Sequence, residues 1–138
     1  MGFTRYYEIF SPLDKQKFAQ FSQDCNVICE EITKISGHGI AGYDGYGDPR
    51  FTEDIVSFNG IDDNAHESFA IDTACKGFYF TKTQLKPYDL HVEACLELAK
   101  YYFGEDIRVS SDADEPNEKI TQLVTQLIRE KKIGQILS

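Results

Sequence analysis

The apolar positions of the first forty residues follow two patterns. Residues 3–10 are rich in aromatic side chains, which is typical of a β-strand. Downstream, apolar side chains recur at alternating spacings of three and four, which places them on one face of a long helix. We expect Ser11 to cap this helix, Pro12 to occupy its first position and Gly37 to end it. The apolar face consists of Phe18, Phe21, Cys25, Ile28, Ile32 and Ile35.

The pattern changes to strands in the middle of the chain. Residues 36–54 hold five glycines and a proline, which predicts a long loop with a short strand at 40–43. Three further strands are predicted at 54–59, 67–74 and 77–81. In the last two, apolar side chains alternate with polar or smaller ones, as in half-buried antiparallel strands. The alternating apolar positions are Phe69, Ile71, Phe78 and Phe80.

Two more helices and one strand are predicted in the last third. A helix opens at Leu85-Lys86-Pro87 and ends at Gly104, and a short strand follows at 107–109. Residues 110–115 form an acidic loop, and a third helix follows Pro116. The second helix has its apolar face at Val92, Cys95, Leu96, Ala99, Tyr102 and Phe103, and the third at Ile120, Leu123, Val124, Leu127 and Ile128.

The predicted order of elements is β-α-β-β-β-α-β-α. Strands gather in the middle instead of alternating with helices, which excludes a doubly wound parallel sheet. We therefore expect an α+β fold, in which a mainly antiparallel sheet of about five strands packs against three helices. The 138 residues correspond to one domain, spanning 1–138.

Composition supports a folded chain with an ordinary core. Apolar residues make up 41% of the chain and charged residues 27%, as in most globular domains. No apolar run has the length of a membrane span, and the first residues lack the apolar stretch of a secretory signal. We expect a cytoplasmic protein that does not bind membranes.

The charge of the chain is strongly negative and unevenly distributed. Twenty-three acidic and fourteen basic side chains give −9 at pH 7. Residues 38–75 carry eight acids and one arginine, and residues 105–118 carry six acids and one arginine. Residues 119–132 are the reverse, with four basic side chains and one acid. Such a chain is repelled by nucleic acid and anionic lipid, whereas a basic protein partner would be attracted.

The four cysteines do not form a recognisable metal site. Cys25, Cys29, Cys75 and Cys95 contain no C-x-x-C pair, and no histidine follows at zinc spacing. We interpret them as reduced thiols in the core and predict neither a metal nor another cofactor.

One segment favours a small anionic ligand. It runs from a strand into a helix start, where free backbone N–H groups and the helix dipole attract negative charge. Lys82, Thr83 and Lys86 lie in this segment, and His66, a histidine beside acids that could titrate near neutral pH, is the fourth candidate ligand residue. The alternative is that these residues only cap the helix, since the segment lacks the glycines of a phosphate-binding loop.

Two loops are candidates for binding a protein. The first is rich in glycine and carries Tyr43, Asp44, Tyr46 and Asp48. Tyrosine offers a large contact area at low entropic cost. The alternative is a connecting loop whose tyrosine rings fold back onto the core. The second loop runs from Asp62 and Asp63 to His66 and Glu67, where a divalent ion, an acid–base pair or simple turn formation are all compatible with the residue types.

The sequence contains no evident catalytic set. The motifs G-x-S-x-G, H-E-x-x-H, G-x-x-x-x-G-K-[ST] and G-x-G-x-x-G are all missing, and the acids at 112–115 lack the glycine of a calcium loop. His91, between Leu90 and Val92 of the second predicted helix, is expected at the surface or an edge.

Several short segments resemble a family of small uncharacterised bacterial proteins. The resemblance covers roughly residues 2–114, and it departs at Thr81, at Ala113 and after Asp114, where the family would have cysteine, glycine and tryptophan. It supports one shared fold and transfers no catalytic residue. The segments are GFTRYY (2–7), GDP (47–49), FNG (58–60), HESF (66–69), FYFTKTQLKPYDL (78–90), YYFGE (101–105) and RVSSDAD (108–114).

Three functional hypotheses follow from these observations. The leading one is a small acidic protein that binds another macromolecule, as inhibitor or immunity proteins do. Its contact residues would be Tyr43, Asp44, Tyr46, Asp48, Asp62 and Asp63. The alternative is a small enzyme or ligand-binding domain for an anionic metabolite or nucleotide, using Lys82, Lys86 and His66. A structural subunit of a larger complex fits the same sequence.

Overall fold

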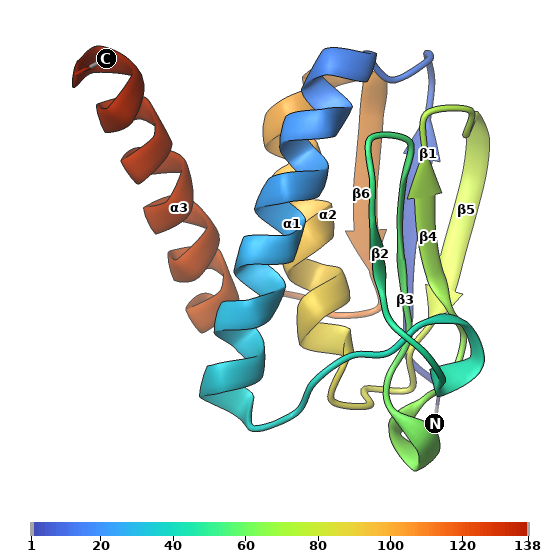
Figure 1. The fold of residues 1–138 in the computed structure, drawn as a ribbon. Helices are drawn as coiled ribbons and strands as arrows, with labels where there is room; N and C mark the ends of the chain where they lie inside the picture. Colours follow the sequence, from blue (N-terminus) through green and yellow to red (C-terminus); the bar gives the residue numbers. More distant parts are fainter. Residues whose placement is uncertain (1, 138) are drawn as a thin grey trace.

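The computed structural model describes residues 2–137, which form three α-helices and two three-stranded antiparallel sheets (Figure 1). No helix in this range is long and apolar enough to cross a membrane. The elements are β1 (Thr4–Ile9), α1 (Lys15–Ser36), β2 (Arg50–Phe51), β3 (Ile55–Phe58), β4 (Phe69–Asp72), β5 (Gly77–Lys82), α2 (Asp89–Phe103), β6 (Ile107–Ser111) and α3 (Glu118–Leu137).

The predicted α+β class is confirmed, but the strand count and the order differ. The strands form two sheets, with orders β5-β1-β6 and β2-β3-β4, and the chain reads β-α-β-β-β-β-α-β-α. The additional strand, β2, lies inside the segment predicted as loop and has only two residues, too few for an alternating pattern. The strand predicted at 40–43 is reduced to one bridge between Ala41 and Asn59.

The two sheets and the helices share one core. Tyr7 of β1 links the sheets, because its ring contacts Phe69 of β4 and its hydroxyl donates a hydrogen bond to the Ala70 carbonyl. On the other side, α1 and α2 lie side by side against the strands (Figure 1). The aromatic rings of Phe21 and Phe103 meet edge to face between these helices, with centroids 5.2 Å apart.

Helices α1 and α2 begin at later residues than the sequence pattern predicted. Asp14, not Ser11, caps α1, because its carboxylate accepts the Lys17 N–H at 2.8 Å. The predicted end of α1 is confirmed, since Gly37 adopts the left-handed conformation with φ 76°. At α2, Gln84 and Leu85 both have positive φ, which excludes them from a helix, and α2 begins at Asp89.

Three apolar side chains that were expected on buried faces are exposed. Ile35, expected on the apolar face of α1, is 59% exposed because it lies beyond the last contacts with the core. Phe78 and Phe80 of β5 are 60% and 50% exposed. The register with β1 turns Tyr79 and Thr81 inward instead, and the two phenylalanines stay on the outer face with Tyr6.

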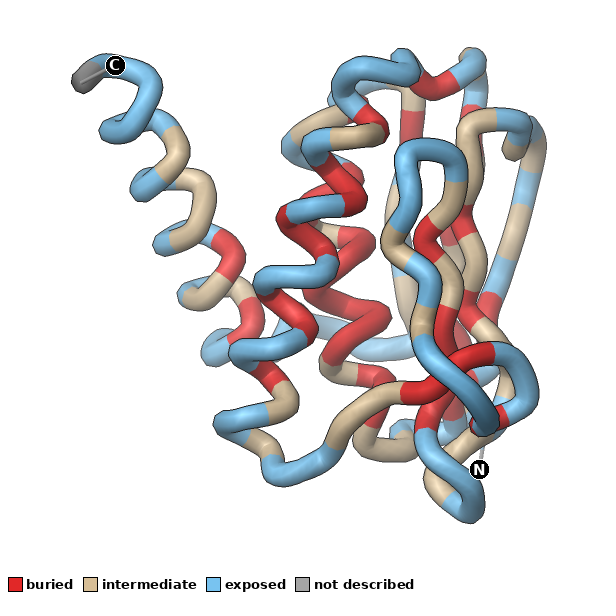
Figure 2. The backbone as a smooth tube through the Cα atoms, in the orientation of Figure 1, coloured by how far each residue is buried: buried red, intermediate tan, exposed pale blue. Residues whose placement is uncertain are grey.

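The helix α3 is attached mainly through its first half. Ile120 and Val124 are buried, whereas Ile136 is 82% exposed, and Figure 2 shows the last turns of α3 away from the rest of the molecule. Farther along, Lys131 reaches back to the Asp24 carboxylate at 3.0 Å. This helix therefore combines a short apolar contact with one ionic contact.

Candidate functional site

The two loops proposed to bind a protein are packed against each other. Each contains a 3₁₀ turn, Tyr43–Gly45 in the first and Asp62–Asn64 in the second. Gly45 has φ 88°, and a Cβ at this position would lie 2.9 Å from Ala65 of the second loop. The backbone N–H of Asp44 also donates to the Ser68 hydroxyl at 3.4 Å. Glycine at position 45 thus allows the two loops to approach closely.

One buried amide holds the second loop in place. Asn59, fully buried, accepts the N–H groups of Gly60 and His66 at 2.7 and 2.9 Å through its side-chain oxygen. Its amide nitrogen donates to the His66 carbonyl at 3.0 Å and to the Ser68 hydroxyl at 3.1 Å. All of the side chain's polar atoms are therefore used in closing the loop, and this positioning role was not predicted.

The packed loops carry all six residues predicted to contact a protein, and all six are exposed. Tyr43 and Tyr46 are 73% and 70% exposed, so they do not fold back onto the core. Ile61, directly before the second turn, is 44% exposed. The four aspartates are exposed as well. We call this set the tyrosine–aspartate surface; its members are Tyr43, Asp44, Tyr46, Asp48, Ile61, Asp62 and Asp63.

The residues proposed for an anionic ligand are engaged in other contacts. Thr83 is fully buried and donates its hydroxyl hydrogen to Asp89 at 2.6 Å. The ammonium of Lys86 donates to the Asp63 carbonyl at 3.1 Å, and that of Lys82 lies over the Phe80 ring. His66 is exposed. The cavities beside α3 and beside β6 are lined by other residues.

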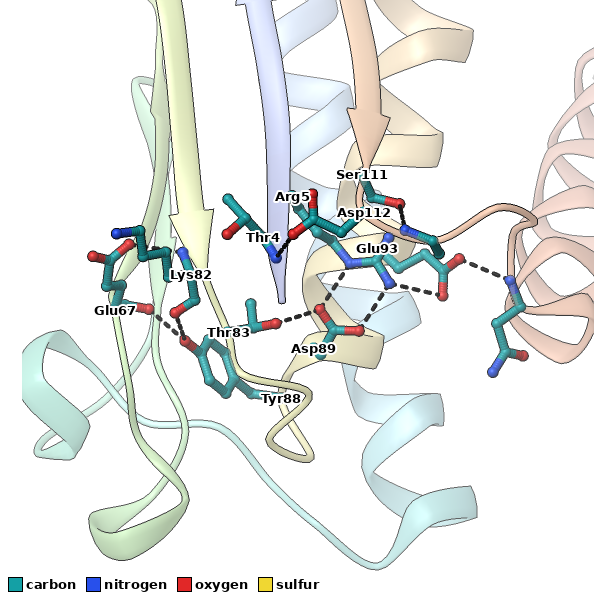
Figure 3. A network of polar contacts seen from close by, with 12 residues as sticks. Thr4, Arg5, Glu67, Lys82, Thr83, Tyr88, Asp89, Glu93, Ser111 and Asp112 are labelled. Atoms are coloured by element: carbon teal, nitrogen blue, oxygen red, sulfur yellow. Dashed lines mark hydrogen bonds and ion pairs between the residues drawn. The ribbon is translucent and has the colours of Figure 1, made fainter. Parts of the chain in front are cut away.

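A buried charged network lies at the same end of the molecule (Figure 3). Arg5 of β1 forms two hydrogen bonds of 2.8 Å with the carboxylate of Asp89 at the start of α2. Glu93, one helical turn further, lies 3.6 Å from the same guanidinium. All three side chains are at least nine-tenths buried. Burial raises the pKa of Glu93, an effect that Arg5 and the Asn117 N–H only partly offset.

The sequence carries a local signal for this network. Arg5 occupies the same face of its strand as Tyr7 and Ile9, both of which are buried. Asp89 and Glu93 are four residues apart on α2 and therefore share a face. An arginine in a core-facing strand position requires a buried acid, and this pair supplies it.

The surface position predicted for His91 is wrong. Its side chain is fully buried, and its Nε2 lies 3.1 Å from the Thr33 hydroxyl of α1. Burial lowers the pKa of His91 to about 4, so the ring is neutral near pH 7. The apolar face predicted for α2 did not include His91. The helix buries more of its circumference than that face, because α1 and the sheets cover it on several sides.

Three of the four thiols lie in the core as predicted. Cys25, Cys29 and Cys95 are buried between α1 and α2, with 3.7 Å between the sulfurs of Cys29 and Cys95. Burial raises the pKa values of all three thiols. Cys75 is half-buried. Over residues 2–137, no three histidine, cysteine or carboxylate side chains are placed to hold a metal ion.

Comparison with known proteins yields no family assignment. No family model, curated protein or solved structure matches this chain. The function is therefore inferred from the geometry of the tyrosine–aspartate surface.

Proposed function

We propose that this protein binds a basic region of a protein partner through its tyrosine–aspartate surface, in the manner of an inhibitor or immunity protein. The observation that carries the proposal is the packing of two loops that presents two exposed tyrosines among four exposed aspartates. The resemblance to a bacterial family and a cytoplasmic location remain predictions.

The apolar part of the surface suits an interface centre. Tyr43, Tyr46 and Ile61 each expose more than two-fifths of their surface, and large side chains of this kind dominate binding energy when a partner covers them. Because the loops are fixed by Gly45 and by Asn59, little ordering entropy is lost when the partner binds.

The acidic part of the surface suits a positively charged partner. Among residues 2–137, no ion pair involves Asp44, Asp48, Asp62 or Asp63. Their negative charges are available to attract lysine and arginine side chains, which speeds association at low salt. The net charge of −9 extends this attraction over longer distances.

The test compares three forms of the immobilised protein in a lysate of the source cells. The wild type is set beside a variant in which Asp44, Asp48, Asp62 and Asp63 become Asn. The control variant also loses four negative charges, at exposed positions elsewhere, through E30Q, E31Q, E53Q and E118Q. A protein retained by the wild type and the control, but lost from the Asp-to-Asn variant, is the expected result.

Kinetics on the purified partner then provide the quantitative test. Removing the four aspartates should slow association about tenfold at low salt and flatten its salt dependence, while the control changes it less. Equal retention by all three forms, or no retained protein, would contradict the proposal.

The anionic-ligand hypothesis has less support. The Thr83 hydroxyl and the Lys86 ammonium would both have to give up hydrogen bonds to meet an anion. Its test is the melting temperature measured with and without phosphate, nucleotides or acidic metabolites. An increase in melting temperature that Lys86→Ala abolishes would support an anionic-ligand site.

A further inference from the structure

One face of the β5-β1-β6 sheet is turned away from the core. Tyr7 and Ile9 of β1 and Thr81 of β5 are buried on the inner face, and side chains alternate between the two faces along each strand. The intervening side chains therefore form an outer face, which also includes the residues directly after β1 and β6. We call this set the outer sheet face; its members are Tyr6, Glu8, Phe10, Phe78, Phe80, Lys82, Arg108, Ser110 and Asp112.

Aromatic rings make up much of the outer sheet face. Phe10, Phe78 and Phe80 are 48%, 60% and 50% exposed. Tyr6 stacks on Phe78 with ring centroids 5.9 Å apart, and the Phe78 ring lies 6.4 Å from that of Phe80. Apolar surface gathered in this way is usual where another molecule binds, since leaving it in water is unfavourable.

The charges of the outer sheet face cancel, although the whole chain carries −9. The acids of this face are Glu8 and Asp112, and its basic side chains are Lys82 and Arg108. Glu8 and Arg108 already form an ion pair between neighbouring strands. Two copies of the chain therefore repel each other less at this face than at the acidic tyrosine–aspartate surface.

The other two charges stand at opposite edges of the outer sheet face. Lys82 lies beside Thr4 in the register of β5 and β1, and the N–H of Asp112 donates to the Thr4 carbonyl from the other side. Two strand spacings, about 10 Å, separate them. The Glu67 carboxylate accepts the backbone N–H of Lys82, and the Tyr6 hydroxyl donates to Asp112. Neither Lys82 nor Asp112 belongs to an ion pair among residues 2–137, so both charges are available to a second molecule.

This arrangement matches itself when a second copy is turned about a two-fold axis parallel to the strands. Such an axis places β5 of one copy over β6 of the other, and β1 over β1. Lys82 of each copy then faces Asp112 of the other, which gives two ion pairs. Phe78 faces Arg108 in the same way, which gives two cation–π contacts. Packed sheets lie about 10 Å apart, a distance that these side chains span together.

We propose that the outer sheet face joins two copies of this chain into a dimer with this two-fold symmetry. A single-stranded nucleic acid, which also stacks on aromatic rings, fits less well because the face has no excess of basic charge. The interface consists of three short strands, so its area lies at the low end for specific complexes, and we expect a micromolar dissociation constant. No residue of the tyrosine–aspartate surface belongs to it, so either proposal can fail without the other.

The experiment is sedimentation equilibrium of the full chain at concentrations from about 1 to about 500 μM. The average mass should rise from that of one chain, 15.7 kDa, toward twice this value. Phe78→Ala should weaken dimerisation at least about tenfold, because the two-fold symmetry removes each contact twice. The matched control is Tyr43→Ala, which also truncates an exposed aromatic ring and should change the dissociation constant less than about twofold.

Charge reversal tests the two-fold pairing. Lys82→Glu places an acid opposite Asp112 in both halves of the dimer and should weaken it about tenfold. Its control is Lys15→Glu at the start of α1, which changes the net charge equally and should weaken dimerisation less than about threefold. Asp112→Lys should weaken the homodimer as well. An equimolar mixture of the Lys82→Glu and Asp112→Lys variants should dimerise about as strongly as the wild type, because both ion pairs are restored.

Three results would overturn the proposal. The first is the mass of one chain at every concentration, and the second is equal weakening by Phe78→Ala and Tyr43→Ala. The third is a mixture of the two charge variants that dimerises no better than either alone; if Asp112→Lys does not fold, equal weakening by Lys82→Glu and Lys15→Glu takes its place. If the chain stays single and binds a fluorescent oligothymidine that Phe78→Ala releases, the outer sheet face belongs to nucleic acid instead.

Discussion

Complete burial of the His91 imidazole couples the stability of the fold to pH. The ring lies between α1 and α2, close to the Thr33 hydroxyl and beside the Phe58 ring. His38 disfavours its protonation further. The protonated form is therefore accommodated much better in the unfolded chain than in the folded one.

The first prediction concerns acid stability. With the folded-state pKa of His91 at about 4 and the unfolded value at 6.5, only the unfolded state gains a proton between these pH values. The free energy of unfolding should therefore fall by up to about 3 kcal/mol as pH decreases from 6.5 to 4. Urea unfolding of the wild type and of His91→Gln measures this loss, which should be smaller in the variant.

The control for this prediction is His66→Gln, because His66 is exposed and is not one of the groups that shift the pKa of His91. Its unfolding curves should follow those of the wild type at each pH. Glu93 acts in the opposite direction, since its raised pKa contributes stability that is lost as pH rises above 4.5. An unchanged pH dependence in His91→Gln would show that His91 is not the group responsible.

At the scale of elements, the close approach of the two 3₁₀ turns depends on one glycine. Gly45→Ala combines an unfavourable φ of 88° with a contact of 2.9 Å to Ala65. We expect a loss of about 2–3 kcal/mol in the free energy of unfolding, and increased hydrogen exchange at residues 61–66.

Gly47→Ala is a matched comparison, since Gly47 also has a positive φ of 72° but nothing lies within 4 Å of a Cβ there. This variant should lose only about 1 kcal/mol and leave the second loop protected. Equal effects of the two substitutions would contradict the packing argument.

A second prediction at the scale of elements concerns which face of each strand is buried. Phe69 of β4 is fully buried, whereas Phe78 of β5 is 60% exposed. Phe69→Ala should cost about 3–5 kcal/mol of unfolding free energy. Phe78→Ala should cost less than about 1.5 kcal/mol, because it loses only surface contacts with the rings of Tyr6 and Phe80. Denaturant unfolding measures both, and a reversed order would mean that β5 has its other face inward.

For the whole molecule, the charge of −9 sets the response to salt. Raising sodium chloride from about 0.1 to about 1 M shortens the screening length from about 10 to about 3 Å. The melting temperature should rise, because repulsion among the acids is screened. The rise should be smaller in the variant with Asn at positions 44, 48, 62 and 63, whose net charge is −5; an equal rise in both would assign the effect to salt in general.

Whether a segment becomes a helix or a strand was largely determined by the sequence alone. Three helices and the main strands follow from apolar spacing, which depends on the local geometry of the backbone. The end of α1 at Gly37 is local for the same reason. The two loops of the tyrosine–aspartate surface were also recognisable, because tyrosine, glycine and aspartate indicate an exposed turn.

Only the tertiary structure decided which faces are buried and which distant residues meet. The alternating pattern of β5 fits either face inward, and pairing with β1 selects Tyr79 over Phe78. Arg5 and Asp89 are 84 residues apart, so no local spacing reveals their ion pair. His91 is buried because α1 covers it. These outcomes depend on how separate elements pack, and the free energy of that packing is a property of contacts that a linear pattern does not contain.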